Sequence, residues 1–276
     1  MSIVIISAVF ALVLAFILGA ALGFFNHLFA VPPDPATDRI RELLPGTNCG
    51  GCGFAGCDAF AAAVSAGSAG DAVCTAGGPT TAAKIAAVTG ISAGDVPQYT
   101  VVLACQGSSA HAAAKGAYSG VRSCRGAKIA TGGTKLCSWA CMGFGDCVSV
   151  CKFGALSMGE NGLPVVSYAK CTGCGMCVKE CPQDVLRLIP SDRKGALALC
   201  SNKNPVKRLA AKACAVACTK CGICVRNCPQ NCISLATHIP VVDYAKCDSC
   251  SVCAEKCPTK VFQILTTNHT NNTNKW

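Results

Sequence analysis

Cysteine spacing is the feature that most constrains this chain. Of its 276 residues 25 are cysteine, and three runs of four share the spacing C-x2-C-x2-C-x3-C followed directly by proline. The runs are Cys171, Cys174, Cys177 and Cys181; Cys218, Cys221, Cys224 and Cys228; and Cys247, Cys250, Cys253 and Cys257. In such a run the first three thiolates hold one 4Fe–4S cluster and the fourth crosses to a partner cluster. The spacing therefore predicts a protein that moves electrons one at a time.

Disulfides and structural zinc are the alternative uses of so much cysteine. A disulfide framework scatters its cysteines along a secreted chain, whereas the x2 spacings here aim neighbouring thiols at a common centre. Structural zinc also uses closely spaced cysteines. Iron–sulfur clusters are favoured over both.

The formal net charge of +10 raises the question of a nucleic-acid partner. A 4Fe–4S core held by four thiolates carries about −2, so six clusters would bring the loaded protein to roughly −2. The basic residues are spread out and aromatic residues are only 6% of the chain. The charge is better explained as compensation for clusters, and no nucleic-acid partner is expected.

Residues 1–30 are predicted to form a transmembrane anchor. The segment Ile3 to Phe25 has no charged side chain, and 23 residues at ~1.5 Å each would cross the ~30 Å apolar core of a bilayer. A cleaved signal peptide would want Lys or Arg before the apolar run. Arg39 and Arg41 follow the helix, so the body is expected on the cytoplasmic side of the plasma membrane.

Residues 31–78 are predicted to form a small cluster domain, in which Cys49, Cys52, Cys57 and Cys74 follow the spacing C-x2-C-x4-C-x16-C. Glycines between them let backbone N–H groups approach the sulfurs. Residues 79–136 form an Ala/Gly-rich connecting domain whose fold is not readable from the sequence. A strand is expected at Val101 to Ala104.

From residue 137 the sequence repeats with a period of about 76 residues. The segment Val165 to Cys171 is echoed by Val241 to Cys247, and each copy carries two cluster motifs. The expected fold class is α+β, with two bacterial-type two-cluster ferredoxin modules at 137–190 and 214–266. A basic linker, 191–213, joins them, and a disordered tail, 267–276, follows.

The crossing of the fourth cysteine assigns ligands in the second module. One cluster takes Cys218, Cys221, Cys224 and Cys257, and its partner takes Cys228, Cys247, Cys250 and Cys253.

The first module departs from this pattern, because Phe144 stands where a second ligand would be. Cys137 is one helical turn before Cys141 if this segment is helical, so it is the expected substitute. The predicted sets are Cys137, Cys141, Cys147 and Cys181, and Cys151, Cys171, Cys174 and Cys177.

Five cysteines remain. Cys232 falls at a strand position where its counterparts are apolar, so it is interpreted as a small buried side chain. The other four are enough for a sixth cluster, although they could instead be free or redox-active thiols. They are Cys105, Cys124, Cys200 and Cys214.

No substrate-bond chemistry is expected of this chain. Cys214-x3-Cys218-x2-Cys221 matches the radical SAM triad, but the run continues directly into a ferredoxin motif. No Ser/His/Asp set, P-loop or GxGxxG fingerprint is present, and the four histidines are scattered.

The segment Leu43-Leu-Pro-Gly-Thr-Asn-Cys-Gly-Gly-Cys-Gly53, placed after an apolar anchor and before ferredoxin modules, resembles the B subunit of the Rnf complex. Cys137-Ser-Trp-Ala-Cys-Met-Gly-Phe-Gly-Asp-Cys147 resembles the longer, cluster-rich form of that protein. The resemblance covers nearly the whole chain except the tail.

The resemblance implies a subunit of a membrane-bound ferredoxin:NAD+ oxidoreductase coupled to Na+ or H+ transport. Soluble ferredoxin would be the electron donor, and the other membrane subunits would receive the electrons from the N-terminal cluster. Two alternatives stay open: a polyferredoxin of a hydrogenase or formate-oxidising complex, and an iron–sulfur regulator or store.

Overall fold

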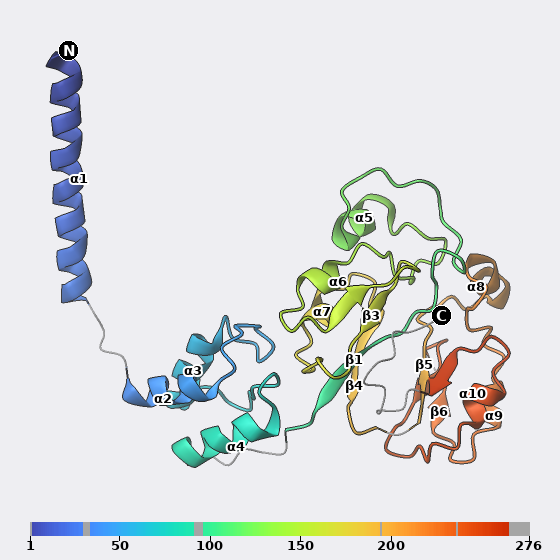
Figure 1. Cartoon of the computed structure of the whole chain (residues 1–276). Coiled ribbons are helices and arrows are strands. Elements are labelled where there is room, and N and C mark those ends of the chain that lie inside the picture. Colours follow the sequence, from blue (N-terminus) through green and yellow to red (C-terminus); the bar gives the residue numbers. More distant parts are fainter. Residues whose placement is uncertain (1, 30–33, 91–95, 194, 236, 265–276) are drawn as a thin grey trace.

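A computed structural model describes residues 2–29, 34–90, 96–193, 195–235 and 237–264. One long helix, α1 (Ser2–Leu28), stands apart from a body of short helices and short strands (Figure 1). The predicted combination of one apolar helix with a body of mixed helices and short strands is observed. The predicted tail, 267–276, lies outside the described residues.

Helix α1 is apolar on all sides. Its segment Ile3–Leu28 has 26 residues, a mean hydropathy of 3.0 and no buried portion. The helix is therefore long enough, at ~1.5 Å per residue, to cross the ~30 Å apolar core of a bilayer. Since it buries no face against the body, its apolar surface is free for an apolar environment outside this chain.

The N-terminal domain packs three helices, α2 (Pro35–Leu43), α3 (Cys57–Ser65) and α4 (Gly78–Thr89). Asp34 precedes α2, and its carboxylate accepts a hydrogen bond from the N–H of Ala36 at 3.0 Å. Ile40 and Ala61 are fully buried, and they join α2 to α3. This small core supports the loop that carries Cys49 and Cys52.

The two ferredoxin-like modules share one plan of two antiparallel strand pairs. In module 1, β1 (Tyr99–Leu103) pairs with β4 (Leu186–Pro190), and β2 (Leu156–Met158) pairs with β3 (Pro164–Val166). In module 2, β5 (Ala196–Ala198) pairs with β8 (Phe262–Ile264), and β6 (Ile233–Ser234) pairs with β7 (Val241–Val242).

Each module has two very short helices, and each of these helices contains one cysteine. They are α6 (Asp146–Ser149) and α7 (Met176–Glu180) in module 1, and α9 (Ile223–Arg226) and α10 (Val252–Glu255) in module 2. Two further helices lie outside this plan, α5 (Cys124–Thr131) and α8 (Lys207–Ala213). Short helices and two-stranded sheets are marginal alone, so the modules depend on what fills their centres.

Each module takes its outer strand from the segment that precedes it. Strand β1 comes from the predicted connecting domain, where the sequence indicated a strand at Val101 to Ala104, and β5 comes from the predicted linker. The strand pairings therefore extend both modules beyond 137–190 and 214–266, while the domain boundaries themselves stay predictions. As a result, Cys105 and Cys200 each follow a strand that belongs to a module sheet.

Candidate iron–sulfur sites

Two cavities are each lined by four cysteines that the sequence grouped together. One, of about 340 Å³, lies in the N-terminal domain, and the other, of about 320 Å³, lies in module 2. Their cysteines are Cys49, Cys52, Cys57 and Cys74 in the first, and Cys218, Cys221, Cys224 and Cys257 in the second. In the second cavity the fourth thiol comes from the other motif of the module, as the crossing pattern requires.

A third cavity, of about 380 Å³, differs from the sequence-based grouping. Its cysteines are Cys124, Cys141, Cys147 and Cys181. Cys137, the expected fourth member, is not among the lining residues. Residues 137–140 form turns and bends instead of a helix, so the spacing of one helical turn does not apply. Cys124 takes its place in this cavity.

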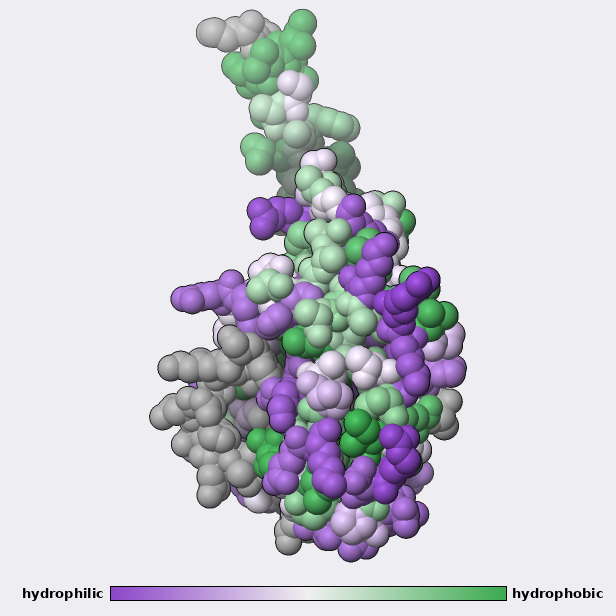
Figure 2. Space-filling view, turned by 90° about the vertical axis from the view of Figure 1, so that its right-hand side faces the viewer, coloured by the Kyte–Doolittle hydropathy of each residue, from purple (hydrophilic) through white to green (hydrophobic). Residues whose placement is uncertain are grey.

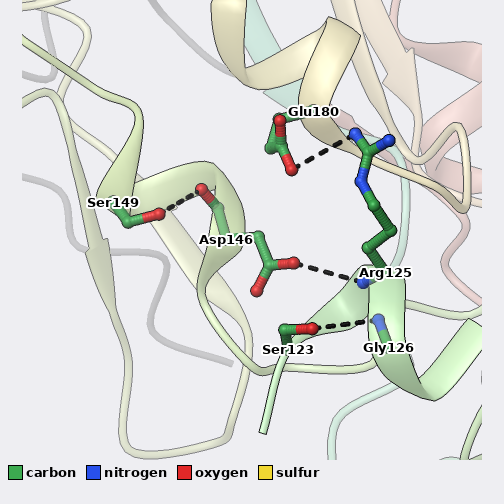
Figure 3. Close-up of polar contacts among 6 residues, drawn as sticks. All are labelled: Ser123, Arg125, Gly126, Asp146, Ser149 and Glu180. Atoms are coloured by element: carbon green, nitrogen blue, oxygen red, sulfur yellow. Dashed lines mark hydrogen bonds and ion pairs between the residues drawn. The ribbon is translucent and has the colours of Figure 1, made fainter. Parts of the chain in front are cut away.

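Polar contacts hold α5, and with it Cys124, against module 1 (Figure 3). The backbone N–H of Arg125 donates to Asp146 Oδ2 at 3.2 Å, and the Arg125 guanidinium donates to Glu180 Oε1 at 3.4 Å. Ser123 caps α5 by accepting from the N–H of Gly126 at 2.9 Å. Asp146 and Glu180 precede Cys147 and Cys181, so these contacts bring Cys124 to both thiols.

The pKa of Cys147 reflects the same arrangement. Burial raises the pKa of its thiol to about 12, and the neighbouring thiols of Cys124 and Cys181 add to the rise. The proximity of Cys124 to this pair therefore has an electrostatic consequence.

The other three leftover cysteines gather around Cys137. We call this group, Cys105, Cys137, Cys200 and Cys214, the bridge site. Burial raises the pKa of Cys214 to about 11, and the thiols of Cys105, Cys200 and Cys137 contribute in the same direction. A Cβ added to Gly107 would lie 3.5 Å from the sulfur of Cys105 and 3.6 Å from that of Cys214. These two sulfurs therefore face one small volume.

The bridge site repeats the internal symmetry of the chain. Cys105 and Cys200 follow β1 and β5, while Cys137 and Cys214 each precede the first motif cysteine of their module by four residues. The N–H of Cys141 donates to the sulfur of Cys105 at 3.5 Å, and the N–H of Cys218 donates to that of Cys200 at 3.4 Å. Each module thus supplies two equivalent thiols.

The two remaining predicted sets are also brought together. Burial raises the pKa of Cys177 to about 12, with Cys171, Cys174 and Cys151 among the thiols that add to it. Burial likewise raises the pKa of Cys253 to about 11, helped by Cys250 and Cys247. The thiol of Cys228 is in turn among the groups that raise the pKa of Cys250.

Several buried polar atoms in the cysteine loops lack a partner among the described residues. They are Thr75 Oγ1, Lys220 Nζ and Ser249 Oγ. Each residue directly follows or precedes a cysteine, so these donors are available to the sulfur atoms of a bound cluster. Unpaired buried donors are costly unless a bound group satisfies them, and this supports the fit of iron–sulfur clusters to these loops.

The spacing of the thiols also bears on the bound group. Within the described residues, no group of three or more His, Cys, Asp or Glu side chains is arranged to hold a single metal ion. Thiolates that surround a 4Fe–4S cluster are separated by the cluster itself and do not need that closer spacing.

The last cysteine, Cys232, is 6% exposed, in agreement with a buried side chain. Its sulfur lies 3.4 Å from that of Cys228. This contact was not foreseen, because the strand pattern indicated burial without indicating a neighbour.

Ferredoxin-like modules with several groups of cysteines, behind an apolar helix, define the chain as an iron–sulfur electron carrier. Comparison with protein families agrees. Models of the 4Fe-4S dicluster domain match residues 140–186, 170–232 and 217–261, and a model of an Fe-S cluster domain matches residues 44–76.

Similar proteins identify the family. The chain is 41% identical over 234 residues to the B subunit of the Na+-translocating ferredoxin:NAD+ oxidoreductase complex of Acetobacterium woodii, covering 85% of this chain and 70% of that protein. It is 38% identical over 244 residues to the B subunit of the proton-translocating complex of Clostridium ljungdahlii, covering 88% and 85%. The chain belongs to the family of B subunits of Rnf-type ion-translocating oxidoreductase complexes, and it is an iron–sulfur electron carrier. The predicted family resemblance is therefore confirmed.

Proposed function

We propose that this chain takes electrons from reduced ferredoxin and passes them, through six ligand sets, to membrane subunits of an ion-translocating ferredoxin:NAD+ oxidoreductase. A bound 4Fe–4S cluster supplies reversible one-electron transfer. The chain itself contributes thiolates, backbone donors to those thiolates, and a surface at each end. The relatives include a Na+-translocating and a proton-translocating complex, so the coupling ion does not follow from the family.

The bridge site carries this proposal. Its sulfurs accept hydrogen bonds from the N–H groups of Cys141 and Cys218, which belong to the third cavity and the module 2 cavity. A sixth ligand set made of Cys105, Cys137, Cys200 and Cys214 would join the two modules into one continuous series. Without it, the two pairs of ferredoxin sites have no ligand set between them.

The N-terminal domain is assigned as the end that delivers electrons to the membrane subunits. A Cβ added to Gly51 would lie 2.7 Å from the carbonyl oxygen of Cys174, so the two cysteine loops are in close contact. Cys49 also raises the pKa of Cys174, after the larger effect of burial. The series then continues from module 1 to the domain that follows the apolar helix α1.

The positive charge of module 2 supports its assignment as the end that receives electrons from ferredoxin. Residues 203–264 contain nine Lys or Arg and three Asp or Glu. The net charge of this part therefore stays positive even with two clusters of about −2 each. Figure 2 views the body from the side of α8, α9 and α10 and shows hydrophilic side chains on this face. Lys207, Arg208 and Lys212 are exposed here. Such a surface would steer an acidic ferredoxin.

We further propose that α1 crosses the membrane and leaves the body in the cytoplasm. Arg39 and Arg41 lie just after the helix, and positive residues favour the cytoplasmic side. Protease treatment of right-side-out and inverted vesicles tests this assignment. Cleavage of the body only in inverted vesicles supports it, and cleavage in right-side-out vesicles contradicts it.

Iron and acid-labile sulfide per chain test the six ligand sets. Anaerobically purified protein should contain about 24 of each, whereas about 20 of each would show that the bridge site holds no cluster. The double variant Cys105→Ala, Cys200→Ala should lose about four irons. Reduced ferredoxin should then reduce the module 2 clusters promptly and the rest slowly, while dithionite reduces all that remain. Equal reduction of every cluster by ferredoxin would overturn the proposed order.

A further inference from the structure

Module 2 has one thiol more than its two clusters need. The sulfur of Cys232 lies 3.4 Å from that of Cys228, and its thiol also interacts with that of Cys247. Both neighbours belong to the proposed set Cys228, Cys247, Cys250 and Cys253. The fifth thiol therefore lies at the edge of this ligand set, while its side chain packs with Ile233 and Val261 in the module 2 core.

Equivalent positions in the other motifs hold apolar side chains. The N–H of Val261 donates to the sulfur of Cys257 at 3.3 Å, and the N–H of Ala155 donates to that of Cys151 at 3.3 Å. Both residues follow their cysteine by four positions, as Cys232 follows Cys228. Packing at this position is thus satisfied without sulfur, and the thiol of Cys232 is available for another role.

We propose that Cys232 is a reserve ligand for the iron that Cys228 holds. When Cys228 is absent or released, the sulfur of Cys232 loses its proton to solvent and forms the iron–sulfur bond in its place. No electron is gained or lost in this exchange, because one thiolate replaces another. The inference rests on the ligand set proposed above for this site.

The position of the reserve thiol suits its surroundings. Among the 25 cysteines, all of which the structure describes, Cys250 is the exposed one, and it belongs to this same set. Exposure makes thiolate ligands vulnerable to oxidation and loss. A buried spare thiol is useful where the cluster meets solvent most directly.

Three variants and a matched control test the inference in the full-length protein. Cys228→Ala should keep the full iron content of the parent and retain the four-iron EPR signals of the reduced protein. Cys257→Ala is the control, because Val261 offers no sulfur in the equivalent position, and this variant should lose between about one and four irons. Cys232→Val, which copies Val261, should keep every iron.

The double variant Cys228→Ala, Cys232→Val distinguishes the reserve role of Cys232 from the ligand role of Cys228. Its loss of iron, together with retention by Cys228→Ala, supports the reserve ligand. If Cys228→Ala alone loses as much iron as Cys257→Ala, the reserve role is overturned while the ligand set stands. If the double variant keeps all its iron, Cys228 is not a ligand and the proposed set itself falls.

Discussion

The backbone N–H of Cys218 donates a hydrogen bond to the sulfur of Cys200, with 3.4 Å between the two atoms. Cys141 and Cys105 make the same contact in module 1 at 3.5 Å. A donated N–H favours the charged form of a thiol, so each contact prepares a bridge-site sulfur to be a ligand. The same contacts fix the bridge site to the start of both cysteine motifs.

Variants of Cys124 and Cys137 should distinguish the structural grouping from the one predicted by spacing. In the background Cys105→Ala, Cys200→Ala, the bridge site is already lost. Adding Cys137→Ala should then cost no further iron, because effects on one site are not additive. Adding Cys124→Ala should cost between about one and four more irons, since it opens the third cavity. Iron analysis measures both.

If Cys137→Ala costs further iron and Cys124→Ala does not, the result would support the grouping predicted from spacing, with Cys137 in place of Cys124. Far-UV circular dichroism of each variant serves as the control that α5 and module 1 remain folded. Equal further losses from both variants would contradict either grouping.

Cysteine spacing alone was sufficient to group the thiols that come from one motif, or from two motifs that exchange their fourth cysteine. The cysteines of the module 2 cavity could be grouped in this way, because tight loops with x2 spacing bring thiols together whatever surrounds them. In the N-terminal cavity Cys49, Cys52 and Cys57 are close in sequence, while Cys74 follows 17 residues later.

The position of Cys124 could not be predicted, because it depends on tertiary contacts. Arg125 reaches Asp146 and Glu180 across a loop that has no periodic pattern. The bridge site did leave a signal in the sequence: a shift of 77 residues aligns Cys137 with Cys214. Treating these two as an equivalent pair would have grouped them.

Gly51 should control electron delivery to the N-terminal domain. In Gly51→Ala the new Cβ would meet the Cys174 carbonyl at 2.7 Å and the Cys174 Cβ at 3.0 Å, so the two loops must separate. Reduction of the N-terminal cluster by ferredoxin should slow, with the module clusters unaffected. Stopped-flow absorbance and freeze-quench EPR follow the two groups.

Gly53→Ala is the control for this prediction, because a Cβ there meets nothing within 4 Å although its φ of +93° adds strain. If both variants slow the N-terminal cluster equally, loop strain and not the contact with Cys174 is responsible.

Lys220 should raise the reduction potential of the cluster in the module 2 cavity. Its ammonium is buried without a partner among the described residues, and Lys220 lines that cavity. A nearby cation favours the more negative, reduced state, so Lys220→Gly should lower the potential by at least ~59 mV, a tenfold change for one electron. Glycine accepts the φ of +54° at this position without strain.

Ser249→Gly is matched to that variant, since Ser249 stands at the same loop position with a φ of +68° and carries no charge. EPR-monitored redox titration should show a smaller shift for Ser249→Gly. Equal shifts in the two variants would mean that loop flexibility, and not the ammonium, sets the potential.

Removal of iron should unfold the two modules before the N-terminal helices. Helices α6, α9 and α10 have only four residues each, and the sheets of the modules have two strands. Such elements do not persist alone, and cysteines form part of both module cores. The N-terminal core also includes Cys74, but its nine-residue helices pack around Ile40 and Phe60 as well. After anaerobic chelation, hydrogen exchange should become fast in both modules and stay slower in α2 and α3. Protected amides throughout β1, β4, β5 and β8 of the iron-free protein would show that side-chain packing alone maintains the modules.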